Sequence, residues 1–331
     1  MSSPITSIGI RKGMGMVQIE QSCFTHLKRT SFARIGGVEQ GQSALRMRAL
    51  LASTLGVIAL GAPFVTTVDA AARPFTKRTS LKAVIFEDVK PLYQKSGDTY
   101  EGFGVDMLNL IKDQAGRRTL KFIPTTSAED GLKAITSGKA DIACGVAFDW
   151  GRAEQVSYTI PFAIGGTRLL TKTSINGTPS SLRGRTVGVV KDSASAKILA
   201  AVVPGASLQT YATPSEAFAA YDSGKVPTLA GGTLWLAANS DAKNSDLVPV
   251  RPYGRTGIGC IVKQNNGKLL AAANNAIGQT MQEYVNGNAA TREMVNRWIG
   301  PGSNVMLPES VISALYSLLL STTSEMSVSP N

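Results

Sequence analysis

The stretch AITSGKADIACG at residues 134–145 has a counterpart, AYDSGKVPTLAGG, at residues 220–232. Each copy has the pattern of a helix end, a Ser-Gly-Lys turn and an apolar strand that closes on glycine. The two copies fall at equivalent places in two series of alternating strand and helix patterns. They therefore predict two similar α/β lobes, each with a mostly parallel sheet covered by helices.

Hydrophobic periodicity and turn residues place the elements of both series. The first series is expected to run strand, helix, strand, helix, strand at residues 81–86, 104–116, 120–125, 127–138 and 140–146. The second repeats this order at residues 186–190, 193–203, 207–211, 215–224 and 226–232. Extended segments at 165–174 and 256–264 are expected to join the lobes, and helices at 268–285 and 291–300 follow. Ligand sites in open α/β sheets lie at the carboxyl ends of such strands.

Residues 1–72 differ from this alternation. A basic start at 46–48 is followed by an apolar run at 49–65 and an Ala-x-Ala exit near Ala72, which is the layout of a cleaved signal peptide. The run contains proline and glycine and is weak for a membrane span, so a soluble protein exported to the periplasm is expected. The expected organisation is a leader and signal peptide (1–72), a first lobe (73–163), a second lobe (164–253), a return to the first lobe (254–300) and a C-terminal extension (301–331).

The composition excludes several classes of function. The 331-residue chain has a net charge of +11, but its lysines and arginines are dispersed and do not alternate with aromatic residues, so nucleic acid is not an expected partner. The single histidine, His26, lies in the predicted leader. The exported part therefore has no Ser-His-Asp or Cys-His site and no imidazole zinc site. We expect a monomer with no cofactor and no bound metal.

The cysteines leave one question open. Cys23 lies in the predicted leader, whereas Cys144 and Cys260 each lie in an apolar, strand-like stretch. An oxidising compartment allows these two to form a disulfide, but sequence spacing does not distinguish a disulfide from two separate buried thiols.

Four blocks of the sequence carry a family pattern: YEGFGVDMLNLI (100–111), SGKADIACGVAFDWGRAEQVSYTIPF (137–162), SLRGRTVGVVKDSAS (181–195) and GIGCIVKQNNGKLL (257–270). In their order and spacing they resemble the type II periplasmic solute-binding proteins of ABC importers, in the branch that binds polar amino acids. The resemblance runs from about Leu81 to Gly300. It implies two α/β lobes joined by two hinge strands, a ligand in the cleft and delivery of that ligand to a membrane permease.

The resemblance also implies roles for single residues. Arg152 falls on the arginine that grips the ligand carboxylate, and its planar guanidinium matches both carboxylate oxygens. Gly145 falls where a backbone carbonyl meets the ligand ammonium, and Ser193 falls on a hydroxyl turn that opens a helix. Taken alone, Arg152 also fits an ion pair with Asp149 or Glu154, and Ser193 also fits a plain helix N-cap.

The sequence departs from this branch at several positions, and the usual stacking aromatics, which would fall near Val89 and on Ser127 or Ala128, are absent. Ala147 replaces a usual threonine, Asp192 replaces a usual glycine, and near Gly232 the acidic residue that pairs with the ligand ammonium is missing. These departures keep a carboxylate-bearing ligand as the expectation but point away from a standard α-amino acid. Asp192 is a candidate for the missing negative charge beside a ligand ammonium, although taken alone it fits an exposed turn acid better. Phe86, Phe148, Trp150 and Trp235 are candidates for aromatic walls of the ligand site, and Phe148 and the two tryptophans also fit core packing.

Two other functions remain open on the same fold. A periplasmic dehydratase acting on a cyclic acid needs a pair of carboxylates that face the cleft, and Glu87, Asp149 and Asp192 are its candidates. A receptor lobe that presents ligand to a signalling partner needs a membrane segment, and residues 310–321 are too short for one. Fold alone does not separate these functions from solute binding.

Overall fold

The computed structural model describes residues 79–86, 89–125, 127–240 and 244–326. They belong to one compact unit. The predicted leader and signal peptide, with Cys23 and His26, lie outside the described residues. Within the described ranges, no helix combines the length and apolar character that a membrane crossing requires.

The first lobe is built from three parallel strands and two helices, in chain order β1 (Ser80–Phe86), α1 (Phe103–Gln114), β4 (Thr119–Thr125), α2 (Ala128–Thr136) and β5 (Ile142–Ala147). β1 lies between β4 and β5 and pairs with both in parallel. The burial of β1 at Leu81, Ala83 and Ile85 on one side and Val84 on the other shows that helices cover both faces of this sheet.

The second lobe repeats this plan, in chain order β8 (Thr186–Val190), α5 (Ala194–Val202), β9 (Ser207–Tyr211), α6 (Pro214–Asp222) and β10 (Thr228–Gly232). β8 lies between β9 and β10 and pairs with both in parallel. The strand order β4-β1-β5 in one lobe therefore matches β9-β8-β10 in the other. The prediction of two similar α/β lobes from the repeated stretch is confirmed.

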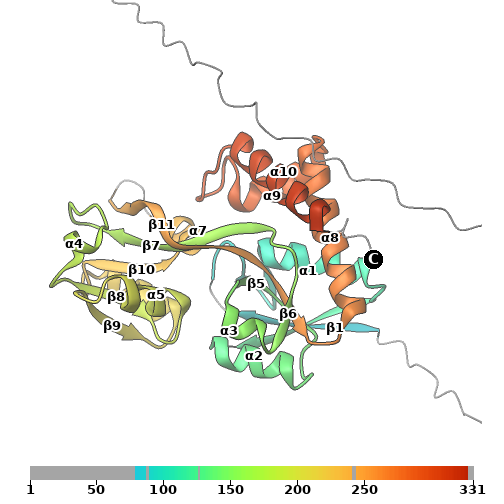
Figure 1. Cartoon of the computed structure of the whole chain (residues 1–331), viewed down its shortest axis with the longest axis horizontal. Coiled ribbons are helices and arrows are strands. Elements are labelled where there is room, and N and C mark those ends of the chain that lie inside the picture. Colours follow the sequence, from blue (N-terminus) through green and yellow to red (C-terminus); the bar gives the residue numbers. More distant parts are fainter. Residues whose placement is uncertain (1–78, 87–88, 126, 241–243, 327–331) are drawn as a thin grey trace, which may run out of the picture. The chain divides into compact units, whose positions relative to one another are not determined.

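Two long strands, β7 (Ala163–Thr171) and β11 (Asp246–Lys263), run between the lobes side by side, as Figure 1 shows in green and orange. In the first lobe, β11 pairs antiparallel with β5, and in the second lobe β7 pairs antiparallel with β10. The guanidinium of Arg168 on β7 donates to the carbonyls of Leu247 and Pro249 on β11. The expected pair of linking strands is confirmed, while the residue at which each lobe begins and ends stays a prediction.

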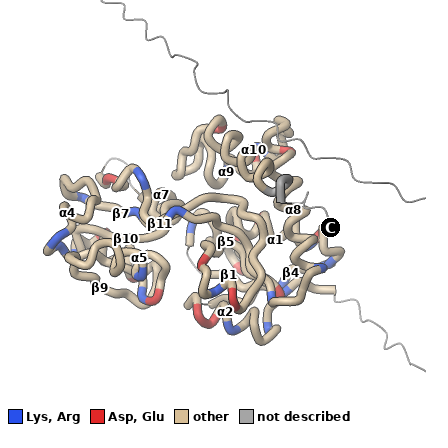
Figure 2. Tube along the Cα trace, in the orientation of Figure 1, with Lys and Arg blue, Asp and Glu red and all other residues tan. Residues whose placement is uncertain are grey.

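The remaining described elements are short connections and a C-terminal group of helices: β2 (Gln94–Ser96), β3 (Thr99–Glu101), α3 (Trp150–Ala153), β6 (Val156–Tyr158), α4 (Pro179–Leu182), α7 (Thr233–Asn239), α8 (Gly267–Val285), α9 (Ala289–Ile299) and α10 (Glu309–Met326). In Figure 2, basic and acidic residues are scattered among the elements of both lobes, as the dispersed charges of the sequence predict.

Cys144 on β5 and Cys260 on β11 form a disulfide. They face each other directly in the register of the two antiparallel strands, and both are fully buried. The pairing that the sequence left open is therefore present. It links positions 116 residues apart and closes a covalent loop that contains the whole of the second lobe.

The last helix packs on the first lobe through Ile312 and Tyr316, which are buried in its main core. The rings of Tyr316 and Tyr284 on α8 meet edge to face, 5.4 Å between centroids. Glu309, in the first turn of α10, accepts a hydrogen bond of 2.6 Å from the Asn296 amide of α9. The C-terminal extension is thus a packed part of this lobe up to at least Tyr316.

Candidate functional site

A cavity of about 240 Å³ lies between the two lobes, where the ends of β5 and β10 approach the two linking strands. In the first lobe, its wall is formed by residues that come after β1 and by residues at the end of β5. In the second lobe, its wall includes residues at the starts of α5 and α7. We call it the inner cavity. Its position at strand carboxyl ends is the one that open α/β sheets use for ligands.

The inner cavity has a lining of glycines, apolar side chains and hydroxyls. The polar side chains that line it are the hydroxyls of Thr167, Ser193, Ser195, Thr233 and Thr256. Among the described residues that line it there is no lysine, arginine, aspartate or glutamate. The lining therefore offers neutral hydrogen bonds and apolar contact, without a full charge of either sign.

A second, wider cavity of about 720 Å³ adjoins the inner one and shares Val89, Val190, Ser193 and Pro214 with it. We call it the outer cavity. Its walls are the end of β1 and the start of α2 in the first lobe, and the loops that precede α5 and α6 in the second. Its charged lining residues are Glu129, Asp130, Lys191 and Asp192.

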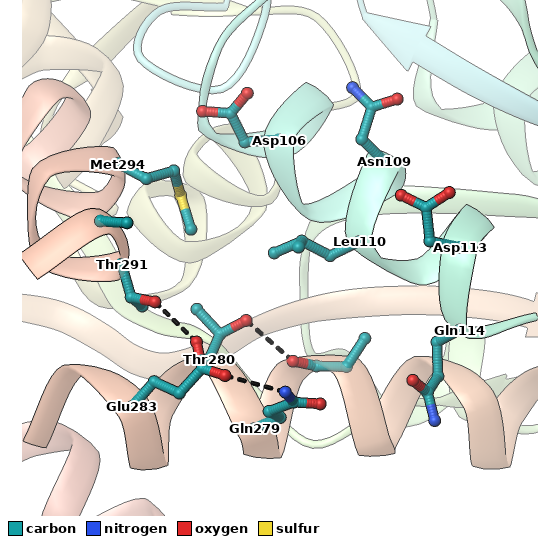
Figure 3. A pocket seen from close by; sticks show the side chains of 12 residues that line it. Asp106, Asn109, Leu110, Asp113, Gln114, Gln279, Thr280, Glu283, Thr291 and Met294 are labelled. Atoms are coloured by element: carbon teal, nitrogen blue, oxygen red, sulfur yellow. Dashed lines mark hydrogen bonds between the residues drawn. The ribbon is translucent and has the colours of Figure 1, made fainter. Parts of the chain in front are cut away.

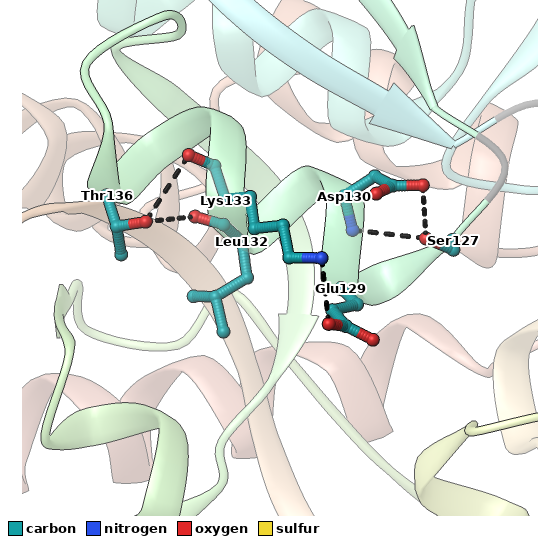
Figure 4. Close-up of polar contacts among 6 residues, drawn as sticks. All are labelled: Ser127, Glu129, Asp130, Leu132, Lys133 and Thr136. Atoms are coloured by element: carbon teal, nitrogen blue, oxygen red, sulfur yellow. Dashed lines mark hydrogen bonds and ion pairs between the residues drawn. The ribbon is translucent and has the colours of Figure 1, made fainter.

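The carboxylates of α2 are engaged within their own helix, as Figure 4 shows. Ser127 caps this helix by accepting a 3.1 Å hydrogen bond from the Asp130 N–H, and its hydroxyl donates to the Asp130 carboxylate at 2.8 Å. Glu129 forms a 2.9 Å ion pair with Lys133, and the hydrogen bond to Glu129 raises the pKa of Lys133. These two acids stabilise the start of α2 and are not a free pair facing the cavity.

The start of α5 is fixed by two hydroxyls. Ser193 lines both cavities and accepts a 3.1 Å hydrogen bond from the Ala196 N–H, so its predicted N-cap role is present. The buried hydroxyl of Thr167 on β7 donates to Ser195 at 3.0 Å. Asp192, just before the cap, has a left-handed backbone (φ 58°) and lines the outer cavity only.

Gly145 lies in β5, near the end of the strand, at the wall of the inner cavity. Its φ of +75° is one that side chains disfavour, and a Cβ there would lie 2.8 Å from Leu92 Cδ1. The hydroxyl of Tyr93 donates a 3.1 Å hydrogen bond to the carbonyl of Cys144, the residue before it. The end of β5 is therefore fixed by backbone shape on one side and by a buried tyrosine on the other.

We expect Tyr93→Phe to lower the free energy of unfolding at pH 7 by about 1 kcal/mol, the usual worth of one hydrogen bond. Burial raises the pKa of the Tyr93 hydroxyl, and the bond to Cys144 lowers it in part. The unfolded chain loses this proton near pH 10, so the stability is complete below about pH 10 and falls as the pH rises further. In the variant, the free energy of unfolding should fall less steeply with pH than in the wild type, by up to about 1.4 kcal/mol per pH unit. Urea denaturation at pH 7 and pH 11 measures both effects.

Tyr316→Phe is the matched control. Burial also raises the pKa of Tyr316, but its hydroxyl has no hydrogen-bond partner among the described residues. In this variant, the free energy of unfolding should also fall less steeply above about pH 10, but it should not be lowered at pH 7. Equal losses at pH 7 in both variants would contradict the role given to the bond between Tyr93 and Cys144.

Arg152 lies in α3, directly behind the wall of the inner cavity. Its Nη1 donates to the carbonyl of Ala147 at 3.0 Å and to the Tyr158 hydroxyl at 3.1 Å. Asp149 accepts from the backbone N–H of Arg152 at 2.8 Å and so caps the short helix. No carboxylate forms an ion pair with the guanidinium among the described residues. Arg152 does not line either cavity, although Ala147, which it contacts, lines the inner one.

Of the four aromatic residues predicted to form walls of the site, two line a cavity. Phe86 lines the outer cavity and Trp235 lines the inner one. Phe148 and Trp150 line neither; their rings meet edge to face at 4.8 Å, and Trp150 is 81% exposed. The structure thus places Gly145, Ala147, Ser193 and Gly232 at the inner cavity, Phe86, Asp192 and Ser193 at the outer one, and Arg152, Phe148 and Trp150 outside both.

Several apolar residues of the inner wall are absent from the predicted set, among them Leu92 and Ile198. Leu92 lies in the loop after β1, and Ile198 lies on α5 among other apolar residues. No local pattern distinguishes either one from a core residue. Only the packing of the two lobes brings them to the same cavity.

A groove of about 590 Å³ lies elsewhere, on the first lobe between α1, α8 and α9 (Figure 3). Several of the polar side chains that line it are already hydrogen-bonded. Glu283 accepts from Gln279 at 2.8 Å and from Thr291 at 2.6 Å, and Asp106 accepts from Trp298 at 2.7 Å. Because these bonds connect α1, α8 and α9, we interpret the groove as part of the packing of these helices.

Known proteins match most of the described chain. A model of the bacterial extracellular solute-binding proteins, family 3, matches residues 81–301. The virulence sensor protein BvgS of Bordetella pertussis is 24% identical over 235 residues, which cover 70% of this chain and 18% of that protein. This chain therefore spans about a fifth of that curated relative.

Solved structures match the fold. An ancestral arginine-binding protein bound to arginine is 24% identical with a TM-score of 0.59, covering 68% of this chain and 100% of the other. An ancestral amino-acid-binding protein, a precursor of cyclohexadienyl dehydratase, is 21% identical with a TM-score of 0.58, covering 68% and 96%. At these identities the likeness shows a shared two-lobed α/β fold.

Proposed function

The chain belongs to the bacterial extracellular solute-binding proteins, family 3, and from this premise we propose that it binds a small carboxylate-bearing solute between its lobes for delivery to an ABC permease. The observation that carries the proposal is the inner cavity, whose wall takes residues from both lobes and from both linking strands. A solute in this place would contact both lobes and both linking strands.

Arg152 is proposed to bind the carboxylate. Its guanidinium has no ion-pair partner among the described residues, and it contacts the carbonyl of Ala147 at the cavity wall. In the proposed complex it exchanges its bonds to the uncharged acceptors of Ala147 and Tyr158 for two bonds to the charged carboxylate. The planar fork of a guanidinium matches both oxygens of a carboxylate, and the opposite charge strengthens the two bonds.

Closure of the lobes is proposed to accompany binding, with β7 and β11 as the hinge. The pairing of these strands shifts register between Val248 and Tyr253 and again between Tyr253 and Thr256. Irregular pairing leaves backbone groups that can take up a change in direction, and such short segments are where hinges form.

A thermal-shift screen of the exported form tests the proposal. The probes are amino acids, other organic acids and amines. A solute bound only by the folded state at 100 times its Kd adds about 2.7 kcal/mol of stability, so carboxylates are expected to raise the Tm by a few degrees. If none of the carboxylates raises the Tm, the proposed function is wrong.

Two other roles, an enzymatic and a sensory one, can be distinguished from solute delivery by experiment. A dehydratase, which one structural relative preceded, would convert a cyclic acid with a pair of carboxylates. Of the candidate carboxylates, Asp149 caps α3, Asp192 lines the outer cavity, and Glu87 lies outside the described residues. Mass spectrometry of incubated cyclic acids detects such turnover. A sensory role is suggested by the likeness to BvgS. In that case cells that lack this protein lose a response to the solute, whereas in a transport role they lose uptake of the solute.

A further inference from the structure

We propose that the solute has an apolar body and no ammonium group, so that its class is the apolar monocarboxylates. This inference rests on the proposed function and concerns the end of the solute opposite the carboxylate. It is carried by the inner cavity, which combines walls from both lobes with a lining whose described residues bear no charge.

Among the described residues that line the inner cavity, none supplies a counter-charge for an ammonium. The polar side chains of the lining are hydroxyls, and two of them, Thr167 and Ser195, are hydrogen-bonded to each other. Asp192 lines only the outer cavity. A desolvated cation without an ionic partner costs several kcal/mol, so an amino acid pays more to enter than its deaminated analogue.

The walls of the inner cavity suit an apolar body instead. Leu92 of the first lobe and Ile198 of the second line it, together with Trp235. The indole of Trp235 lies directly against the backbone of Gly231, where a Cβ would be 2.4 Å from Trp235 Cε3. A flat aromatic surface held in this way gives dispersion contact to an aliphatic or aromatic group.

Gly232 offers a way to test the missing charge. It lines the inner cavity, has an ordinary φ of −63°, and a Cβ built on it meets no heavy atom within 4 Å. It is also the N-cap of α7, a position where aspartate and asparagine are both favoured. Gly232→Asp therefore adds a carboxylate to the cavity without a clash, and Gly232→Asn adds the same shape without the charge.

The experiment measures the Kd of four matched probes by calorimetry: 3-phenylpropanoate, L-phenylalanine, 2-phenylethylamine and 3-phenylpropanol. They carry, in turn, a carboxylate alone, both charges, an ammonium alone and neither charge. An isobutyl series led by 4-methylpentanoate and L-leucine repeats the comparison for a smaller body. We expect the wild type to bind each carboxylate at least about tenfold more tightly than its amino acid.

The two Gly232 variants are expected to differ in their preference between carboxylate and amino acid. Gly232→Asp is expected to shift the ratio between carboxylate and amino acid at least about tenfold toward the amino acid, while Gly232→Asn leaves the ratio near the wild-type value.

The outcomes separate the two proposals. Equal or tighter binding of the amino acids by the wild type overturns this inference and leaves the carboxylate role standing. Equal binding of 3-phenylpropanol and 3-phenylpropanoate overturns the carboxylate role and leaves the uncharged cavity standing. No binding in either series overturns both, and an equal shift in the aspartate and asparagine variants overturns the charge argument.

Discussion

Cys144→Ala/Cys260→Ala is expected to lower the free energy of unfolding by about 4–5 kcal/mol. The two cysteines are 116 residues apart and buried in paired strands, so the disulfide closes a very long loop. Closing a loop of about 100 residues removes conformational entropy from the unfolded chain worth about 4.7 kcal/mol. Urea denaturation of the oxidised wild type and of the double variant measures the difference.

Reductant provides the control for this prediction. Dithiothreitol should lower the stability of the wild type by a similar amount and leave the double variant unchanged. A difference below about 1 kcal/mol between oxidised and reduced wild type would contradict the argument from loop closure.

Arg152→Ala is expected to weaken binding of the best carboxylate about 100-fold, because removal of one partner of a hydrogen-bonded charge pair costs about 2–5 kcal/mol. Calorimetric titration measures the Kd. The variant also loses the bonds to Ala147 and Tyr158, so its unfolding without ligand is measured separately.

Tyr158→Phe is the matched control, because it removes one of these bonds and keeps the guanidinium. It should change the Kd less than about threefold, and Arg152→Lys should fall between the two because a lysine keeps the charge and loses the planar fork. Equal affinity of the wild type and Arg152→Ala would show that the carboxylate binds elsewhere.

The sequence predicts the lobes well because their signals are local. The strand patterns at 186–190 and 207–211 coincide with β8 and β9, and the repeated stretch correctly places β5 and β10 in equivalent positions. Buried parallel strands are short apolar runs bounded by turns, and amphipathic helices carry a 3.6-residue period. Both kinds of signal lie within a single element and need no tertiary information.

The rest of the fold and site depends on contacts between distant segments. β11 begins at Asp246, ten residues before the predicted strand, because its first part is exposed and gains its pairing from β7. The disulfide depends on the register of β5 and β11, which spacing does not reveal. Leu92 and Ile198 become neighbours of one cavity only when the lobes meet.

The disulfide also determines what a protease leaves behind. Every residue from Gly145 to Gly259, including the whole second lobe and both connections to it, lies inside the loop that Cys144 and Cys260 close. A single peptide-bond cut anywhere in this interval therefore yields two fragments that still migrate as one species until the sulfur bond is reduced. Limited digestion compared with and without reductant thus reports whether the chain has been cut between Cys144 and Cys260.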